Sequence, residues 1–193
     1  MSARSVAAHR GGALCLCLCA LLAGTFLAPP APGAEAASEY QLKAVFILNF
    51  TRFVEWPAQT FAAPGDPFVI GILGDDPFGT RLDEAIRNEH VGDHPLVVRR
   101  YRKPEDLGNC QMLFIGRSEG AALGQISSGL GHRAVLVVSE IDGSAEKGAM
   151  IQFATENDRI RLRINADAAH AAGLVISSKL LHLAEIVSAR PGD

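Results

Sequence analysis

The sequence lacks the features that usually mark an enzyme, a metalloprotein or a nucleic-acid-binding protein. No Ser/His/Asp set and no acid/base pair is singled out by its spacing. His90, Asp93 and His94 could be drawn as metal ligands, but Pro95 and the strand that follows disfavour their convergence, and the other histidines after the signal show no pairing at helical ligand spacing. The formal net charge is −3, so there is no basic excess to attract a nucleic acid. We therefore expect a non-enzymatic protein that acts by binding, with no cofactor and no metal.

The first residues have the pattern of an export signal. Two arginines precede the apolar run 13–28, and the small residues of 34–36 offer a cleavage site. No later run approaches the roughly 20 apolar residues that a membrane span needs. We therefore expect residues 1–37 to be a cleaved signal peptide and residues 38–190 to form a single α/β domain outside the cytoplasm.

Loss of the signal changes the charge and the thiol content. Residues 1–37 contain two of the 18 basic and one of the 21 acidic residues, so the rest of the chain has a net charge of −4. Three of the four cysteines leave with the signal, and Cys110 remains. Its apolar surroundings in the sequence predict an inert buried thiol, with an intersubunit disulfide or a redox sensor as the alternative.

Short apolar runs alternate with amphipathic segments through most of the chain. Strands are predicted at 68–73, 94–101, 110–115 and 133–138, with helices at 75–88 and 119–130 between them. Continuous apolar strands separated by helices indicate a largely parallel sheet that is covered on both faces. Two alternating segments around the turn 155–158 predict an antiparallel hairpin. Asn165 is expected to cap a last helix that runs to about residue 187.

The predicted fold class is therefore α/β, with three layers: a largely parallel sheet flanked by helices, and an antiparallel hairpin near the C-terminus. Within this fold, the segment 39–57 carries apolar side chains around far more of a helix than one packed face needs. At 100° per residue they spread over roughly 200°, against about 100° for an ordinary surface helix. They are Leu42, Val45, Phe46, Ile47, Phe50, Phe53, Val54 and Trp56. The helix needs two burial partners, and the second is either more of its own domain or another protein.

Four motifs carry a resemblance to a known family. They are Tyr40-Gln-x-Lys-Ala-x-Phe-Ile-x-Asn-Phe-x-Arg-Phe-Val-Glu-Trp-Pro57, Gly148-Ala-Met-Ile-Gln-Phe153, Ile164-Asn165 and Ala172-Gly-Leu-Val-Ile-Ser-Ser-Lys-Leu-Leu181. In this order they resemble the YfiR/HmsC-like periplasmic regulators over nearly the whole chain after the signal. The first and last motifs are long and specific, whereas the middle of the chain is matched mainly by its strand pattern.

The resemblance implies a repressor in the periplasm. Such a protein binds the periplasmic sensor domain of an inner-membrane diguanylate cyclase, lowers cyclic di-GMP signalling and biofilm formation, and is itself removed by an outer-membrane lipoprotein. The resemblance also implies a homodimer. Family members with cysteine pairs form disulfides that this chain cannot make, because Cys110 is its one thiol after the signal.

The candidate surface for a partner or a second subunit combines the first helix, the corner that follows it and one lysine near the C-terminus. Its residues are Phe46, Asn49, Phe50, Phe53, Glu55, Trp56, Pro57 and Lys179. Trp56 fits either core packing or an aromatic anchor for a partner. Lys179 projects into an apolar arc of the expected last helix, so its ammonium must reach the surface, pair with a carboxylate or contact a partner.

A second candidate site follows the first predicted strand. Gly74, Asp75 and Asp76 lie at the carboxyl end of that strand, where α/β proteins bind small molecules. A periplasmic small-molecule binding module is therefore the alternative function.

Three arginines share one face of the predicted hairpin. Arg159, Arg161 and Arg163 alternate along one strand, so their side chains point to the same side. This face is either solvated or a dock for an acidic partner or for phospholipid headgroups.

Overall fold

The computed structural model describes residues 32–189. Nearly all of the expected signal peptide lies outside these residues, so its cleavage stays a prediction. The first helix, α1, spans Pro32–Phe53 and therefore begins before the expected cleavage position. Among residues 32–189, no helix has the length and apolar content that crossing a membrane requires.

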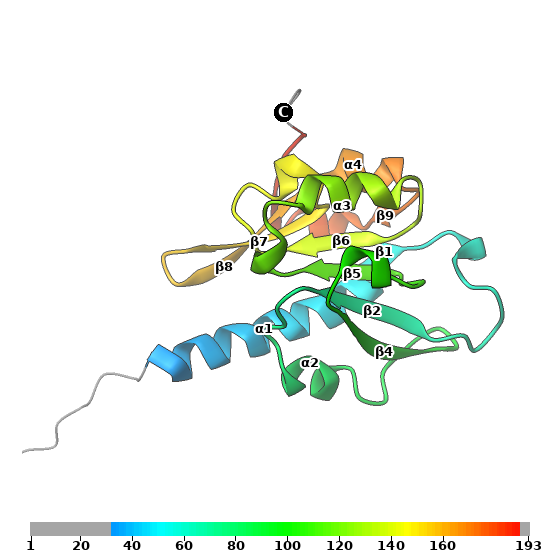
Figure 1. Cartoon of the computed structure of the whole chain (residues 1–193), viewed down its shortest axis with the longest axis horizontal. Helices are drawn as coiled ribbons and strands as arrows, with labels where there is room; N and C mark the ends of the chain where they lie inside the picture. Colours follow the sequence, from blue (N-terminus) through cyan, green and yellow to red (C-terminus); the bar gives the residue numbers. More distant parts are fainter. Residues whose placement is uncertain (1–31, 190–193) are drawn as a thin grey trace, which may run out of the picture.

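The fold is built on an eight-stranded sheet with the order β10-β8-β7-β6-β5-β2-β4-β3 (Figure 1). The strands are β2 (Phe68–Leu73), β3 (His90–Val91), β4 (His94–Tyr101), β5 (Met112–Ile115), β6 (Leu136–Ser139), β7 (Ile151–Glu156), β8 (Arg159–Ile164) and β10 (Ala184–Ile186). The five strands from β7 to β4 run parallel to one another. β7 and β8 form the predicted antiparallel hairpin, and β10 lies parallel to β8. The predicted mixed α/β fold with a mostly parallel sheet is confirmed.

Helices cover both faces of this sheet. They are α1, α2 (Thr80–Ala85), α3 (Leu123–Leu130), α4 (Ala166–Ala171) and α5 (Ser178–Leu181), and short 3-10 turns lie at Ala58–Thr60, Pro104–Asp106, Arg117–Glu119 and Ala145–Lys147. Phe68, Ile70 and Ile72 of β2 pack in one cluster with α1 and α2. Val69 and Leu73 of the same strand pack in a second cluster with α3. A strand that is buried on both sides needs apolar residues at every position, which explains the continuous apolar runs.

The prediction of one last helix from Asn165 to about residue 187 is wrong. Asn165 does cap a helix, because its Oδ1 accepts a hydrogen bond from the backbone N–H of Ala168 at 2.9 Å, but α4 ends at Ala171. Gly173 then turns the chain with φ +77°. Three short elements follow in turn, β9 (Val175–Ile176), α5 and β10, and of their apolar residues Ile176 and Leu180 are buried.

The first helix is also shorter at its end than the predicted limit of Pro57. It stops at Phe53 because β1 (Val54–Glu55) pairs antiparallel with β9. The backbone O of Phe53 accepts a hydrogen bond from the N–H of Ser177 at 2.8 Å, which fixes this end. Pairing with a strand about 120 residues away overrides the local helical pattern.

Two other helices begin later than predicted. Asp76 Oδ1 accepts hydrogen bonds from the backbone N–H groups of Phe78 and Gly79, so these residues form a turn and α2 starts at Thr80. The expected helix from residue 119 starts at Leu123, after a 3-10 turn at Arg117–Glu119.

Trp56 lies beyond the end of α1 and packs within its own domain. Its Nε1 donates a hydrogen bond to the backbone O of Gln111 at 3.0 Å, and its ring packs edge-on against Phe68 with 4.8 Å between ring centroids. Because Gln111 directly precedes β5, this contact holds the C-terminal end of α1 to the amino edge of the sheet.

We predict that Trp56→Ala lowers the free energy of unfolding by about 2–4 kcal/mol, since it removes a packed ring and a hydrogen bond. The free energy of unfolding of Trp56→Phe, which keeps a ring, should lie between those of the native protein and Trp56→Ala. Trp56 is the single tryptophan of the chain, so both variants lose tryptophan fluorescence, and urea unfolding should be followed by circular dichroism. Unchanged stability together with lost partner binding would instead identify Trp56 as an anchor for a partner.

Candidate functional site

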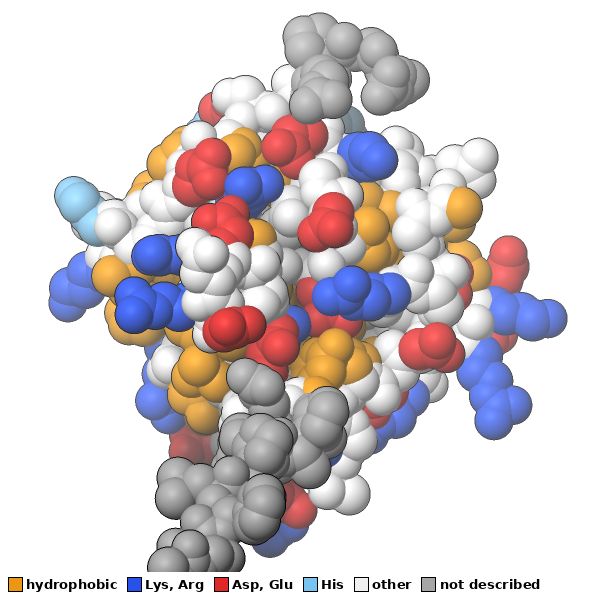
Figure 2. Space-filling model, turned by 90° about the vertical axis from the view of Figure 1, so that its left-hand side faces the viewer, with side chains coloured by type: hydrophobic (Ala, Val, Ile, Leu, Met, Phe, Trp, Pro, Cys, Tyr) orange, Lys and Arg blue, Asp and Glu red, His pale blue; other side chains and the backbone are white. Residues whose placement is uncertain are grey.

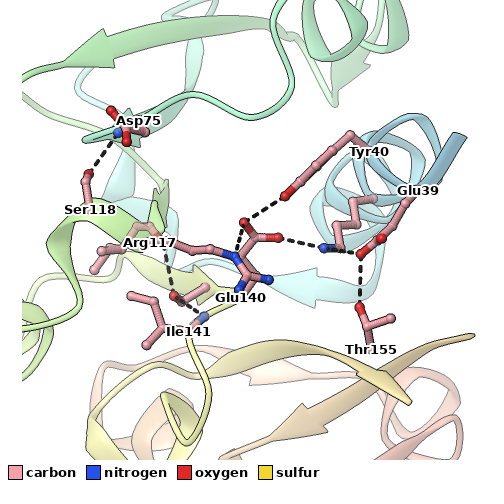
Figure 3. A network of polar contacts seen from close by, with 11 residues as sticks. Glu39, Tyr40, Asp75, Arg117, Ser118, Glu140, Ile141 and Thr155 are labelled. Atoms are coloured by element: carbon pink, nitrogen blue, oxygen red, sulfur yellow. Dashed lines mark hydrogen bonds and ion pairs between the residues drawn. The ribbon is translucent and has the colours of Figure 1, made fainter. Parts of the chain in front are cut away.

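A buried carboxylate, Glu140, lies at the centre of a polar network at the carboxyl edge of the sheet (Figure 3). It directly follows β6. Its Oε2 accepts a hydrogen bond from Lys43 Nζ at 2.6 Å, and its Oε1 accepts from Tyr40 Oη and from Arg117 Nε, each at 3.1 Å. Two of these donors belong to α1, so the network holds the N-terminal half of this helix against the sheet.

Lys43 is fully buried although its side chain is charged. In addition to Glu140 it pairs with Glu39, one turn earlier on α1, at 2.6 Å. Glu39 in turn accepts a hydrogen bond from Thr155 Oγ1 of β7 at 2.9 Å. The Lys43 ammonium also lies 4.7 Å from the centroid of the Tyr40 ring. One lysine thus connects the helix, the end of β6 and the hairpin.

The surroundings hold these groups in their ordinary charge states. Burial would lower the pKa of Lys43, but the hydrogen bonds and negative charges of Glu140 and Glu39 outweigh it and raise that pKa. Burial would raise the pKa of Glu39, but the hydrogen bonds from Lys43 and Thr155 lower it. Burial and the charge of Glu140 raise the pKa of Tyr40. None of these three shifts moves a pKa toward 7, where the pKa of a general acid or base is most effective. The arrangement therefore suits a structural tie.

The wide apolar arc of α1 is buried on one side of the helix and exposed on the other. Ala44, Ile47 and Phe50 are fully buried in the core. Leu42 and Val45 point away from it and remain 49% and 44% exposed. The domain thus covers one part of the arc and leaves another part open.

A groove lies beside this open part, between α1 and the β7–β8 hairpin. Its volume is about 610 Å³, and Leu42, Phe46 and Ile160 contribute its large apolar side chains. Charged residues, among them Asp158 and Arg159, also line it. Figure 1 shows both elements projecting to the same side, and Figure 2 shows hydrophobic side chains among charged ones on the face of the molecule at that side.

The predicted interface residues of the first helix and its corner lie between the middle of α1 and the segment just after it, and they differ in exposure. Phe50 is fully buried and stacks on Phe153 with 5.7 Å between centroids, so a partner cannot reach it. Phe46 is half-buried against both of these rings. Asn49, Phe53 and Pro57 are also half-buried, and Glu55 is exposed. Trp56 is also half-buried, because it packs against Phe68 and donates a hydrogen bond to Gln111.

The expected position of Lys179 in an apolar arc is wrong. Because the last helix is interrupted, Lys179 lies on the four-residue helix α5 and is exposed.

The candidate ligand site at the end of β2 is filled by the protein's own side chains. Gly74 has φ +80°, and a Cβ atom there would collide with Ser118 Oγ. That hydroxyl accepts a hydrogen bond from the N–H of Asp75 at 3.0 Å. Asp76 Oδ2 pairs with Arg100 Nε at 2.7 Å. This geometry gives the small-molecule alternative no support at Gly74–Asp76.

Cys110 is buried, as its apolar sequence context predicts. Burial raises the pKa of its thiol to about 11, so little reactive thiolate forms near neutral pH. The inert thiol is therefore the interpretation that the structure supports.

Sequence reasoning missed Lys43, Glu140 and Arg117. A signal for the first was present, because Lys43 lies one and two turns before Ile47 and Phe50, on the face that packs into the core. A charge at such a position requires a buried partner. The sequence offered no means of choosing Glu140, which is 97 residues away, as that partner.

Comparison with known proteins points to one group. A family model described as YfiR/HmsC-like matches residues 40–185, well over half of the 193-residue chain. The match begins at Tyr40 and includes the network residues Lys43, Arg117 and Glu140. No curated protein matches the chain.

We predict that Lys43→Met lowers the free energy of unfolding by about 3–5 kcal/mol, because Glu140 then keeps a buried charge without its ammonium partner. Lys179→Met removes an exposed lysine and should change stability by less than about 0.5 kcal/mol. The double variant Lys43→Met/Glu140→Gln should lose less than the sum of its two single changes. Urea unfolding of Lys43→Met, Glu140→Gln and the double variant measures this coupling. Losses of unfolding free energy that simply add would argue against the ion pair.

We also predict a specific acid sensitivity. The pKa of Glu39 is lowered from its ordinary 4.5 in the folded chain, so the stabilisation by its carboxylate is present above that value and is lost as the pH falls through the lowered pKa. Glu39→Gln should therefore flatten the decline in unfolding free energy between about pH 5 and pH 3. Glu55→Gln removes an exposed carboxylate and controls for net charge. An unchanged slope in Glu39→Gln would contradict the assignment.

Proposed function

This chain belongs to the YfiR/HmsC-like family, and from that premise we propose that it represses an inner-membrane diguanylate cyclase by binding the periplasmic sensor domain of that enzyme. The protein is then a non-enzymatic regulator in the periplasm that lowers cyclic di-GMP signalling and biofilm formation. Its further partners in this proposal are a second copy of itself, as a homodimer, and an outer-membrane lipoprotein that removes it from the cyclase.

The observation that carries the proposal is the open apolar side of α1. Leu42 and Val45 are each about half exposed on a helix whose other side is tightly packed. Burying the exposed part of both would contribute about 2 kcal/mol, which is too little for a specific complex on its own. The adjacent groove, with Phe46 and Ile160, supplies the additional apolar surface that a partner needs.

The buried network supports the same interpretation. Lys43 and Tyr40 hold the N-terminal half of α1 in one position relative to the sheet. A surface that is fixed before binding loses little entropy on association, which favours affinity. Repression then requires no chemistry, since a protein that binds one state of the sensor better than the other shifts the sensor toward that state.

We predict that Leu42→Glu/Val45→Glu weakens binding to the purified sensor domain at least tenfold, because charged side chains would be buried against an apolar partner surface. Gln41→Glu is the matched control, since Gln41 is exposed on the same helix and the change also adds a negative charge. Isothermal titration calorimetry gives the affinities, and urea unfolding should show that all variants stay folded. An unchanged affinity of the double variant would exclude the open side of α1 as the interface.

A further inference from the structure

The three arginines of β8 differ in their surroundings. Arg163 pairs with Glu156 at 3.0 Å and with Glu185 at 3.1 Å. Arg159 and Arg161 are exposed, and neither has an ion-pair partner among the residues that the structure describes. Glu156 lies opposite Arg159 in the register of the hairpin, but its carboxylate is turned to Arg163. Two positive charges on this strand are therefore left without a partner.

The backbone beside these two arginines is also open on one side. β10 pairs with β8 from Leu162 to Ile164, and the first half of β8, residues 159–161, extends beyond it. Along that half, β7 is the one strand within residues 32–189 that pairs with β8. Figure 1 shows this part of the hairpin projecting past the rest of the sheet. An edge of this kind has backbone N–H and C=O groups that can pair with an added strand.

An exposed aliphatic side chain lies next to the start of the open edge. β10 begins at Ala184, which is opposite Leu162, and the preceding residue Leu183 is 76% exposed. It is the most exposed of the large hydrophobic side chains in the described part of the chain. Positive charge, an open edge and an apolar contact thus occur together.

We propose that the first half of β8 docks an extended acidic segment of a protein partner. The segment adds as a strand along residues 159–161, its carboxylates pair with Arg159 and Arg161, and an apolar side chain of it packs against Leu183. A membrane surface is disfavoured as the occupant, because lipid recognition typically uses clusters of about four to eight basic residues and two are free here. The inference shares with the proposed function the premise that the chain acts by binding, and its surface adjoins the α1 groove, whose lining includes Arg159 and Ile160.

The test uses the purified protein and a synthetic probe. The probe is a fluorescein-labelled peptide of about eight residues in which glutamate alternates with valine, and its binding is followed by fluorescence anisotropy. We expect binding that weakens several-fold between about 50 mM and about 300 mM salt. Arg159→Glu/Arg161→Glu should reduce the affinity at least tenfold. Arg102→Glu/Lys103→Glu, the same charge change at an exposed pair after β4, should leave it unchanged.

Further arms separate strand pairing from general charge attraction. A probe that is N-methylated at both its glutamates and its valines, and so cannot donate backbone hydrogen bonds along either edge, should bind at least tenfold more weakly. Arg159→Gln/Arg161→Gln removes the two charges without reversing them and should also lower the affinity for the peptide. This variant replaces the charge-reversed one if charge reversal disturbs folding. The inference is overturned if both charge-reversed pairs lose affinity equally, if the N-methylated probe binds as well, or if phosphatidylglycerol vesicles bind in place of the peptide. Such a failure is distinguishable from failure of the proposed function, because the latter is tested by binding of the sensor domain to variants of Leu42 and Val45, which lie on α1 and outside residues 159–161.

Discussion

The ion pair between Lys43 and Glu140 is the interaction on which the placement of the first helix depends. Both side chains are buried, and removing two such charges from water costs several kcal/mol for each ion unless they meet in good geometry. The arrangement that brings α1 to the end of β6 gives each charge its partner. The pair therefore fixes the position of the helix along the sheet, with Tyr40, Arg117 and Glu39 completing the hydrogen bonds.

This constraint has a consequence for the surface of the protein. With Lys43 turned inward, Ala44, Ile47 and Phe50 pack into the core, and Leu42 and Val45 must then face outward. The same residue that orders the helix thus determines which apolar side chains stay open. A stable apolar surface of this kind suits a protein that acts by contact, and the family match makes a periplasmic regulator the natural interpretation.

Much of the fold could be predicted because it depends on local pattern. β2 and β4 begin and end where the apolar runs indicate, and the β7–β8 hairpin follows from two alternating segments. The late start of α2 has a local cause, the turn at Asp76, but the larger failures lie where residues distant in the sequence pair. α1 stops early because Val54 and Glu55 pair with β9, and the last helix is interrupted by β9 and β10. The candidate site shows the same division. The wide apolar arc of α1 could be predicted from the sequence. Which side of the helix faces the core could not, because it depends on the pairing of Lys43 with the distant Glu140.

The most direct test of the central claim is the cellular concentration of cyclic di-GMP in a strain that lacks this gene. If the protein represses a cyclase by contact, the concentration should rise and should fall again when the native gene is restored. An unchanged concentration under several growth conditions, in a strain shown to produce the protein, would contradict the account.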